Sequence, residues 1–119
     1  IKISDAPAKV HKLFRNYETK ILQPLLNYLK TKNSARLLGP SDASVRAPTV
    51  ALDLGCNAFE VAKKLSVEDI LAGGDDFYAV RLLEALGVDI NHGALRLSFV
   101  HYTRQQDVNA VIEALDEVL

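Results

Sequence analysis

Methionine is missing from this sequence of 119 residues, and cysteine occurs once, at Cys56. A single cysteine excludes a disulfide within the chain, so we expect a reducing, cytoplasmic setting. Because methionine is absent even from position 1, the sequence suggests a processed, truncated or excised piece of a protein. These two scarcities predict a cytoplasmic chain that is a fragment.

A long apolar run and an excess of one charge are also missing. No run approaches the roughly 18 apolar residues that span a bilayer, and the first residues show no signal-peptide pattern. With 14 basic and 15 acidic residues, the net charge is −1, so we expect neither nucleic acid nor a membrane as a partner. Apolar residues make up 49% of the chain, which is enough for the core of a single domain spanning residues 1–119.

Apolar residues at steps of three and four predict a long helix over about residues 5–32. Ser4 or Asp5 is its candidate cap, and Pro7 lies in its first turn, where a missing N–H does least harm. Pro24 predicts a kink or a restart. The apolar stripe consists of Val10, Leu13, Phe14, Tyr17, Ile21, Leu25 and Leu29. The basic residues on the other faces are interpreted as solvated: Lys9, His11, Lys12 and Arg15.

Four short apolar segments predict strands within about residues 35–119. The third of them, over 67–72, is expected to bury Ile70 and Leu71, and Gly73–Gly74 is expected to break it. The predicted strands cover residues 35–38, 49–54, 67–72 and 94–100.

Three further helices are expected between and after these strands. Asn57 is the candidate cap of the first, Asp75 or Asp76 of the second and Thr103 of the third, and Gly87 is expected to end the second. The expected core-facing residues are Phe59, Val61, Ala62 and Leu65 in the first, and Val108, Val111, Ile112, Leu115 and Val118 in the third. The element order predicts the α+β class, as a two-layer sandwich of helices on a mixed, largely antiparallel sheet.

Arg96 is the one charged residue within the apolar strand over 94–100. A guanidinium can bind a carboxylate through two parallel hydrogen bonds. The alternative is an arginine on the exposed or edge face of the strand, paired with a nearby acid. Taken alone, the residue favours this alternative.

The other polar candidates have structural explanations. We expect Tyr102 to pack its ring and His101 to cap the strand end. Asp75 and Asp76 are more simply a helix cap than a catalytic or metal-binding pair. Cys56 is expected to be inert and partly buried. No spacing in the sequence indicates a metal site or a catalytic set.

The last third of the chain carries Arg96, Ser98, His101, Tyr102 and Thr103, followed by an amphipathic helix. This pattern resembles the C-terminal small domain of class V aminotransferases and cysteine desulfurases, which are fold type I enzymes that use pyridoxal phosphate. The segments that extend the resemblance are residues 27–30, 35–40, 46–51, 59–65 and 71–87.

The segment over residues 71–87 separates the two branches of this family. In cysteine desulfurases it carries the nucleophilic cysteine, whereas here Gly73, Gly74, Asp75 and Asp76 stand in its place. The sequence is more similar to the desulfurase-like branch of class V aminotransferases, in which a Gly-Asp-Phe-Tyr-Ala run is typical.

The resemblance implies that Arg96 binds the substrate carboxylate in an intact enzyme, with Asp75, Asp76 and His101 beside the substrate. It implies transamination or carbon–sulfur lyase chemistry on an amino acid. The Schiff-base lysine and the cradle of pyridoxal phosphate would belong to a domain absent from this chain. We therefore expect no cofactor-binding, catalytic or metal-binding residue here, and no turnover by this chain alone.

A second hypothesis is a free-standing α+β module that binds a partner or a small ligand, through the sheet face or through residues 73–77. The expected partner is either the missing cofactor-binding domain or a second copy of the chain, because the apolar stripe of the first helix would otherwise stay exposed.

Overall fold

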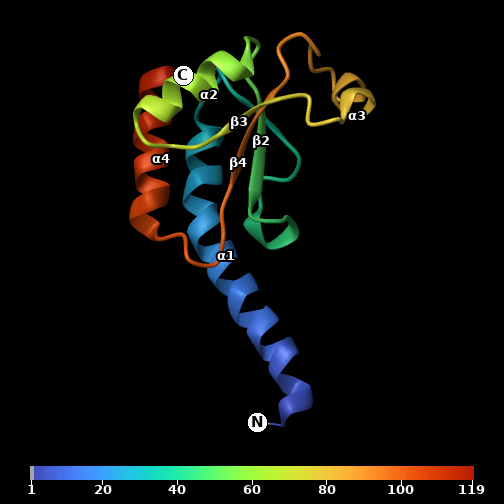
Figure 1. The fold of residues 1–119 in the computed structure, drawn as a ribbon, viewed down its shortest axis with the longest axis vertical. Helices are drawn as coiled ribbons and strands as arrows, with labels where there is room; N and C mark the ends of the chain where they lie inside the picture. Colours follow the sequence, from blue (N-terminus) through green and yellow to red (C-terminus); the bar gives the residue numbers. More distant parts are fainter. Residues whose placement is uncertain (1) are drawn as a thin grey trace.

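The computed structural model describes residues 2–119 (Figure 1). The elements are η1 (Ile3–Asp5), α1 (Ala6–Lys30), β1 (Arg36–Leu38), η2 (Ala43–Val45), β2 (Thr49–Asp53), α2 (Ala58–Val67), β3 (Gly73–Asp75), α3 (Val80–Ala85), β4 (Ala94–Ser98) and α4 (Gln105–Val118). Apart from the two short 3-10 turns, this order of helices and strands is the predicted one.

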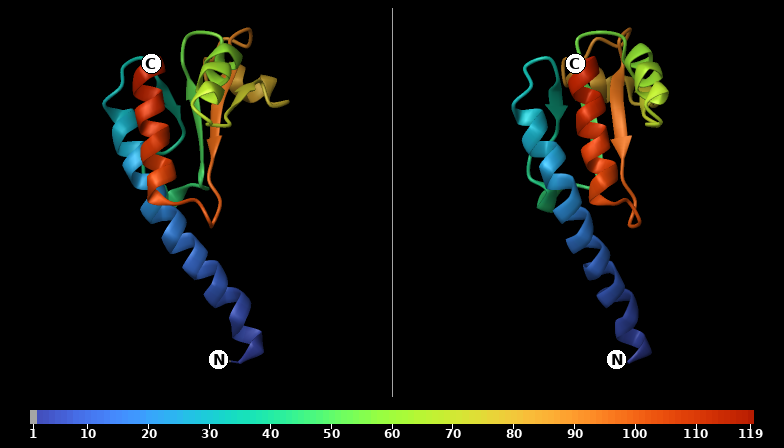
Figure 2. Two further views of the ribbon diagram at one scale, coloured as in Figure 1. Left: turned by 60° about the vertical axis from the view of Figure 1, so that its left-hand side comes forward. Right: turned by 90° about the vertical axis from the view of Figure 1, so that its left-hand side faces the viewer.

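The four strands form one sheet in the order β1-β2-β4-β3, and every neighbouring pair is antiparallel. Helices α1, α2 and α4 cover one face, and α3 lies on the other side (Figures 1 and 2). The core fills the space between the sheet and the three helices. The predicted α+β sandwich is confirmed, and its sheet is antiparallel throughout. The largest fully buried side chains are Leu22, Leu25, Leu26, Val50, Leu52, Leu65, Leu95, Val108 and Leu115.

Helix α1 has two unlike halves. Its second half packs on the core, whereas its first half projects beyond the sheet (Figures 1 and 2). The predicted apolar stripe is therefore buried only from Ile21 onward, and Leu13 is 66% exposed. The helix passes Pro24 without restarting, although the ring leaves the carbonyl of Lys20 without its usual helical donor. Asp5 precedes the helix but forms no side-chain capping bond.

The third strand lies later than predicted. The chain turns after α2, where the amide of Ile70 donates to the carbonyl of Leu65, and Leu71 is 91% exposed. The strand is Gly73–Asp75, so the glycine pair forms the strand instead of breaking it. A Cβ on Gly74 would lie 2.3 Å from the carbonyl oxygen of Ala58, so glycine here allows β3 to pack directly on α2.

The helix ends follow the predictions only in part. Asn57 caps α2 by accepting a hydrogen bond from the amide of Glu60, as expected, but Phe59 is 61% exposed because it lies on the outer side of the helix. Helix α4 begins one residue later than predicted. Its capping residue is Arg104, and the Thr103 hydroxyl instead accepts a bond from the amide of Val100. The remaining predicted core positions of α2 and α4 are buried or partly buried: Val61, Ala62, Leu65, Val108, Val111, Ile112, Leu115 and Val118.

Candidate functional site

The face of the sheet opposite α1, α2 and α4 remains largely open. Alternation along β2 and β4 places Val50 and Leu97 in the core and turns their neighbours to the other side. One end of this open face is closed by α3 and the loop after it, where Leu83 and Val88 pack on Ala94. We call the rest the open face, defined by Thr49, Ala51, Arg96 and Ser98 of β2 and β4.

Arg96 lies at the centre of the open face, opposite Ala51 of β2 and Gly73 of β3. Its side chain is exposed, and its guanidinium carbon lies 4.2 Å from the centre of the Phe77 ring. Within residues 2–119, no carboxylate forms an ion pair with Arg96, and no acceptor takes a side-chain hydrogen bond from it. The cation is therefore held by stacking, while its five N–H donors stay available to a ligand.

Phe77 is the last residue of the 73–77 segment, and its ring holds Arg96 in place. Phe77 and Tyr78 adopt positive φ angles of 52° and 59°, a costly conformation for residues other than glycine. A Cβ on Gly73 would lie 2.9 Å from the Phe77 ring, so the ring covers the bare backbone of Gly73 beside Arg96. The role of Phe77 depends on the pairing of Gly73 with Arg96 across β3 and β4. This pairing is known only once the strand register is known.

Asp75 and Asp76 shape the turn that delivers Phe77. The Asp75 carboxylate accepts from the amide of Asp76 at 2.8 Å, and the Asp76 carboxylate accepts from the amide of Tyr78 at 2.9 Å. Neither residue caps α3, whose capping position is Ala79 and has no side-chain bond. The predicted cap is therefore wrong, because the strand and turn use these carboxylates first. The pair lies one strand away from Arg96 but forms no ion pair with it.

His101 lies beyond the other end of β4, away from Asp75 and Asp76. Its ring stacks on Phe14 of α1 with centroids 4.7 Å apart, and it meets Tyr102 edge-on at 5.3 Å. His101 thus belongs to the contact between α1 and the loop before α4, and the structure does not bring it to Arg96.

Two arginines that the sequence did not assign to a site fix the loop between β1 and β2. Arg15 donates from Nη1 to the carbonyl of Arg46 at 2.6 Å and from Nη2 to the carbonyl of Ser44 at 2.5 Å. Arg46 donates to the carbonyls of Pro40 and Thr49. Arg15 therefore does not belong to a merely solvated helix face, and both residues serve the structure of the loop.

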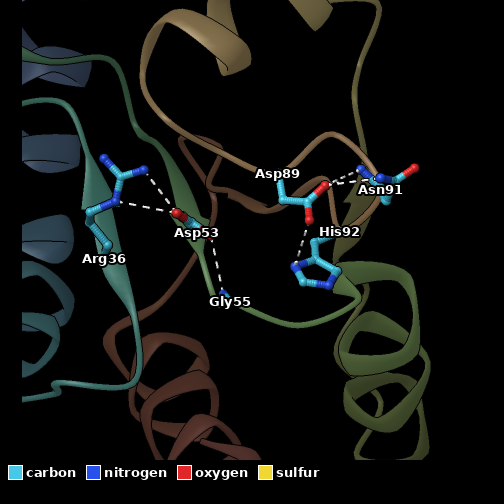
Figure 3. Close-up of polar contacts among 6 residues, drawn as sticks. All are labelled: Arg36, Asp53, Gly55, Asp89, Asn91 and His92. Carbon is cyan, nitrogen blue, oxygen red and sulfur yellow. Dashed lines mark hydrogen bonds and ion pairs between the residues drawn. The ribbon is translucent and has the colours of Figure 1, made fainter.

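Two separate sets of polar contacts lie near one end of the sheet, one around Asp53 and one around Asp89 (Figure 3). Asp53 accepts from Arg36 Nη2 at 2.8 Å and from the amide of Gly55 at 3.1 Å. Partial burial of Asp53 disfavours its charge, but these hydrogen bonds outweigh burial and lower the pKa of Asp53. In the same region, Asp89 accepts from Asn91 and lies 4.0 Å from His92 Nδ1.

Other kinds of site find little support among residues 2–119. No group of three or more His, Cys, Asp or Glu side chains is placed to hold a metal ion in this part of the chain. None of the helices described is long and apolar enough to cross a membrane. Cys56 is exposed, contrary to the expected partial burial, because it lies in the turn between β2 and α2.

Comparisons with known proteins give one consistent result. No family model matches the sequence. An aminotransferase-like protein of Gibberella zeae is 29% identical over 95% of this chain and 29% of its own length. A cysteine desulfurase from Thermococcus onnurineus matches with a TM-score of 0.76 and 21% identity, and one from Escherichia coli with 0.72 and 23%, each over 87% of this chain.

The chain spans only 25% to 29% of the length of these relatives. The matching part of the solved desulfurases has the same helix-and-sheet arrangement as this chain. By sequence this chain is similar to part of the aminotransferase-like protein, and by fold it is similar to part of the cysteine desulfurases, over a length that fits a small domain.

Proposed function

We propose that this chain is the small domain of a pyridoxal-phosphate-dependent enzyme and that Arg96 binds the carboxylate of its amino acid substrate. The observation that carries the proposal is the guanidinium of Arg96, which is exposed on the open face, without an acidic partner in residues 2–119, and stacked on Phe77 at 4.2 Å. A planar guanidinium held in this way matches the two oxygens of a carboxylate.

The residues of this chain do not themselves fit a pyridoxal phosphate site. The cofactor needs a lysine for its Schiff base, and residues 65–119, which contain Arg96 and the loop around it, hold no lysine. On the nearby helix α2, Lys63 and Lys64 are exposed to solvent. Lys32, which follows α1, is paired with Asp116 of α4. We propose that another domain holds the cofactor and that this chain alone does not turn over substrate.

Amino-group transfer is the chemistry that we propose for the complete enzyme, in preference to removal of sulfur. Desulfuration by the related enzymes requires a thiol in the segment that corresponds to residues 71–87, where this sequence has none. The single cysteine, Cys56, lies outside this segment, in the turn between β2 and α2, so it does not replace that thiol. The sequence relative in Gibberella zeae is also described as aminotransferase-like.

The partner that we propose is the cofactor-binding domain, rather than nucleic acid or a membrane. The near-balanced charge supports this choice, and so do Leu13 and Phe14 on the projecting half of α1, which are 66% and 38% exposed. The free, exposed thiol of Cys56 supports a reducing, cytoplasmic location. Self-association through α1 is the alternative, and light scattering at high protein concentration would detect it as a dimer.

Two measurements test the proposal. An absorbance spectrum of the chain mixed with pyridoxal phosphate should show no stable protein Schiff base, whereas a borohydride-trappable adduct at one lysine would contradict the missing-domain proposal. Amide chemical shifts should report weak acetate binding that is lost in Arg96→Gln. The matched variant Arg81→Gln removes an exposed arginine from α3 and should bind acetate normally. Equal binding by all three proteins would exclude Arg96 as the carboxylate site.

A further inference from the structure

An apolar groove lies on the open face between α3 and the sheet. It has a volume of about 340 Å³, which falls within the usual range for small-molecule sites. Among its lining residues, Leu82 and Leu86 of α3 are 59% and 40% exposed, so the groove is open to solvent. Most of the lining is aliphatic or aromatic: Leu38, Ala51, Phe77, Leu82, Leu86 and Ala94.

The groove adjoins Arg96 through two of these residues. Ala51 is the cross-strand neighbour of Arg96 and lies on the same face of the sheet. Phe77 lines the groove while its ring stacks on the guanidinium. Asp76 also lines the groove, but its carboxylate is engaged by the amide of Tyr78. Arg96 does not itself line the groove, but it lies next to two residues that do, so its guanidinium is a free cation beside an apolar groove.

We propose that this groove holds the side chain of the substrate whose carboxylate Arg96 binds, and that the substrate class is apolar amino acids and their 2-oxo acids. The inference rests on the proposed function, because it places the same carboxylate on Arg96. A branched aliphatic or aromatic side chain would cover the exposed parts of Leu82 and Leu86. Leu82, Leu86 and Phe77 are then specificity-determining residues, and Phe77 also positions Arg96.

The test compares three probes that differ in whether they carry a carboxylate for Arg96 and a branched side chain for the groove. Pyruvate offers the carboxylate with a methyl group, α-ketoisocaproate offers the same carboxylate with an isobutyl group, and methyl isobutyl ketone lacks the carboxylate. Their affinities for the full chain are measured from amide chemical shifts. We expect α-ketoisocaproate to bind about tenfold more tightly than pyruvate, because the open groove buries about half of the surface of its three further carbons. The ketone should bind more weakly than α-ketoisocaproate.

Variants separate the contribution of the groove from that of Arg96. Leu82→Ser, at an exposed position, should weaken α-ketoisocaproate binding about threefold and leave pyruvate unchanged. Val67→Ser, at the exposed end of α2 outside the groove, is the matched control and should change neither affinity. Arg96→Gln should weaken both acids.

Each other result overturns a stated part of the account. Equal affinity for the two acids, with both lost in Arg96→Gln, would overturn the groove inference and leave the proposed function standing. Binding of the ketone as tight as that of α-ketoisocaproate would show an apolar docking surface, as for another domain, and would also overturn the inference. Failure of both acids to bind would overturn the inference together with the proposed function.

Discussion

The two faces of the sheet are built by alternate residues of the same strands, yet they differ in kind. On the covered face, Val50, Leu52, Leu95 and Leu97 are at most 3% exposed and pack against three helices. On the open face, their neighbours include Arg96, exposed and without an acidic partner in residues 2–119. Because the covered face provides the packing, the open face can present a free cation and an apolar groove at little cost in stability.

The largest effect is expected from truncating the covered face. Leu95 of β4 is completely buried, so Leu95→Ala should lower the free energy of unfolding by about 3 kcal/mol through lost burial and a cavity. Urea denaturation followed by circular dichroism measures this loss. A loss below about 1 kcal/mol would mean that the covered face is not the main source of stability.

The two glycines of β3, Gly73 and Gly74, are expected to have different effects when substituted, one on the site and the other on stability. In Gly74→Ala, the new Cβ would meet the backbone of Ala58 at 2.3 Å, and we expect a loss of about 2 kcal/mol because backbone must shift. In Gly73→Ala, the Cβ would meet the ring of Phe77 at 2.9 Å, which can move. This variant should lose less stability but weaken acetate binding at Arg96. Equal losses of stability in the two variants would contradict the distinction.

A smaller, pH-dependent effect is expected at the polar end of the sheet. Because the pKa of Asp53 is lowered in the folded state, its contribution to stability is present above the unfolded pKa and is lost as pH falls through the folded pKa. Asp53→Asn should therefore cost up to about 1 kcal/mol at neutral pH, and the difference from wild type should shrink as the pH falls below about 4 and on through the folded pKa.

The control for this prediction is Asp5→Asn at the start of α1. Asp5 forms no side-chain capping bond, so its substitution should change the free energy of unfolding little, both at neutral pH and in the acidic range. A difference for Asp53→Asn that grows as pH falls would have the wrong sign and would exclude the ion pair as its cause.

The smallest effect on stability is expected on the open face itself. Arg96→Gln removes a stacked but exposed cation, so the free energy of unfolding should change by less than about 0.5 kcal/mol. Urea denaturation of this variant and of Leu95→Ala gives the sharpest comparison of the two faces, because the two positions are adjacent in β4. A large loss in Arg96→Gln would assign the arginine a structural role.

The sequence predicts the order of the elements and the fold class because both depend on local patterns. Apolar residues at Val108, Val111 and Leu115 recur with helical spacing, and Asn57 stands where a helix cap is needed. The resemblance that singled out Arg96 also depends on a local motif. These features could therefore be read without knowing which segments meet.

The errors arose where tertiary contacts decide the structure. The position of β3 depends on the approach of Gly74 to α2, and the role of Phe77 depends on the pairing of Gly73 with Arg96. The resemblance places His101 beside the substrate in an intact enzyme, and in this chain its ring packs on Phe14, which is far away in the sequence. Strand register and long-range packing leave no signature within a short window of sequence.

The most direct measurement is a map of the amide chemical shifts that change when α-ketoisocaproate is added to the isotopically labelled chain. We expect changes concentrated on the open face and its groove, at Ala51, Phe77, Leu82 and Arg96, and we expect their loss in Arg96→Gln. Changes concentrated instead along α1 or α4, or changes that persist in Arg96→Gln, would contradict the claim that the open face is the functional one.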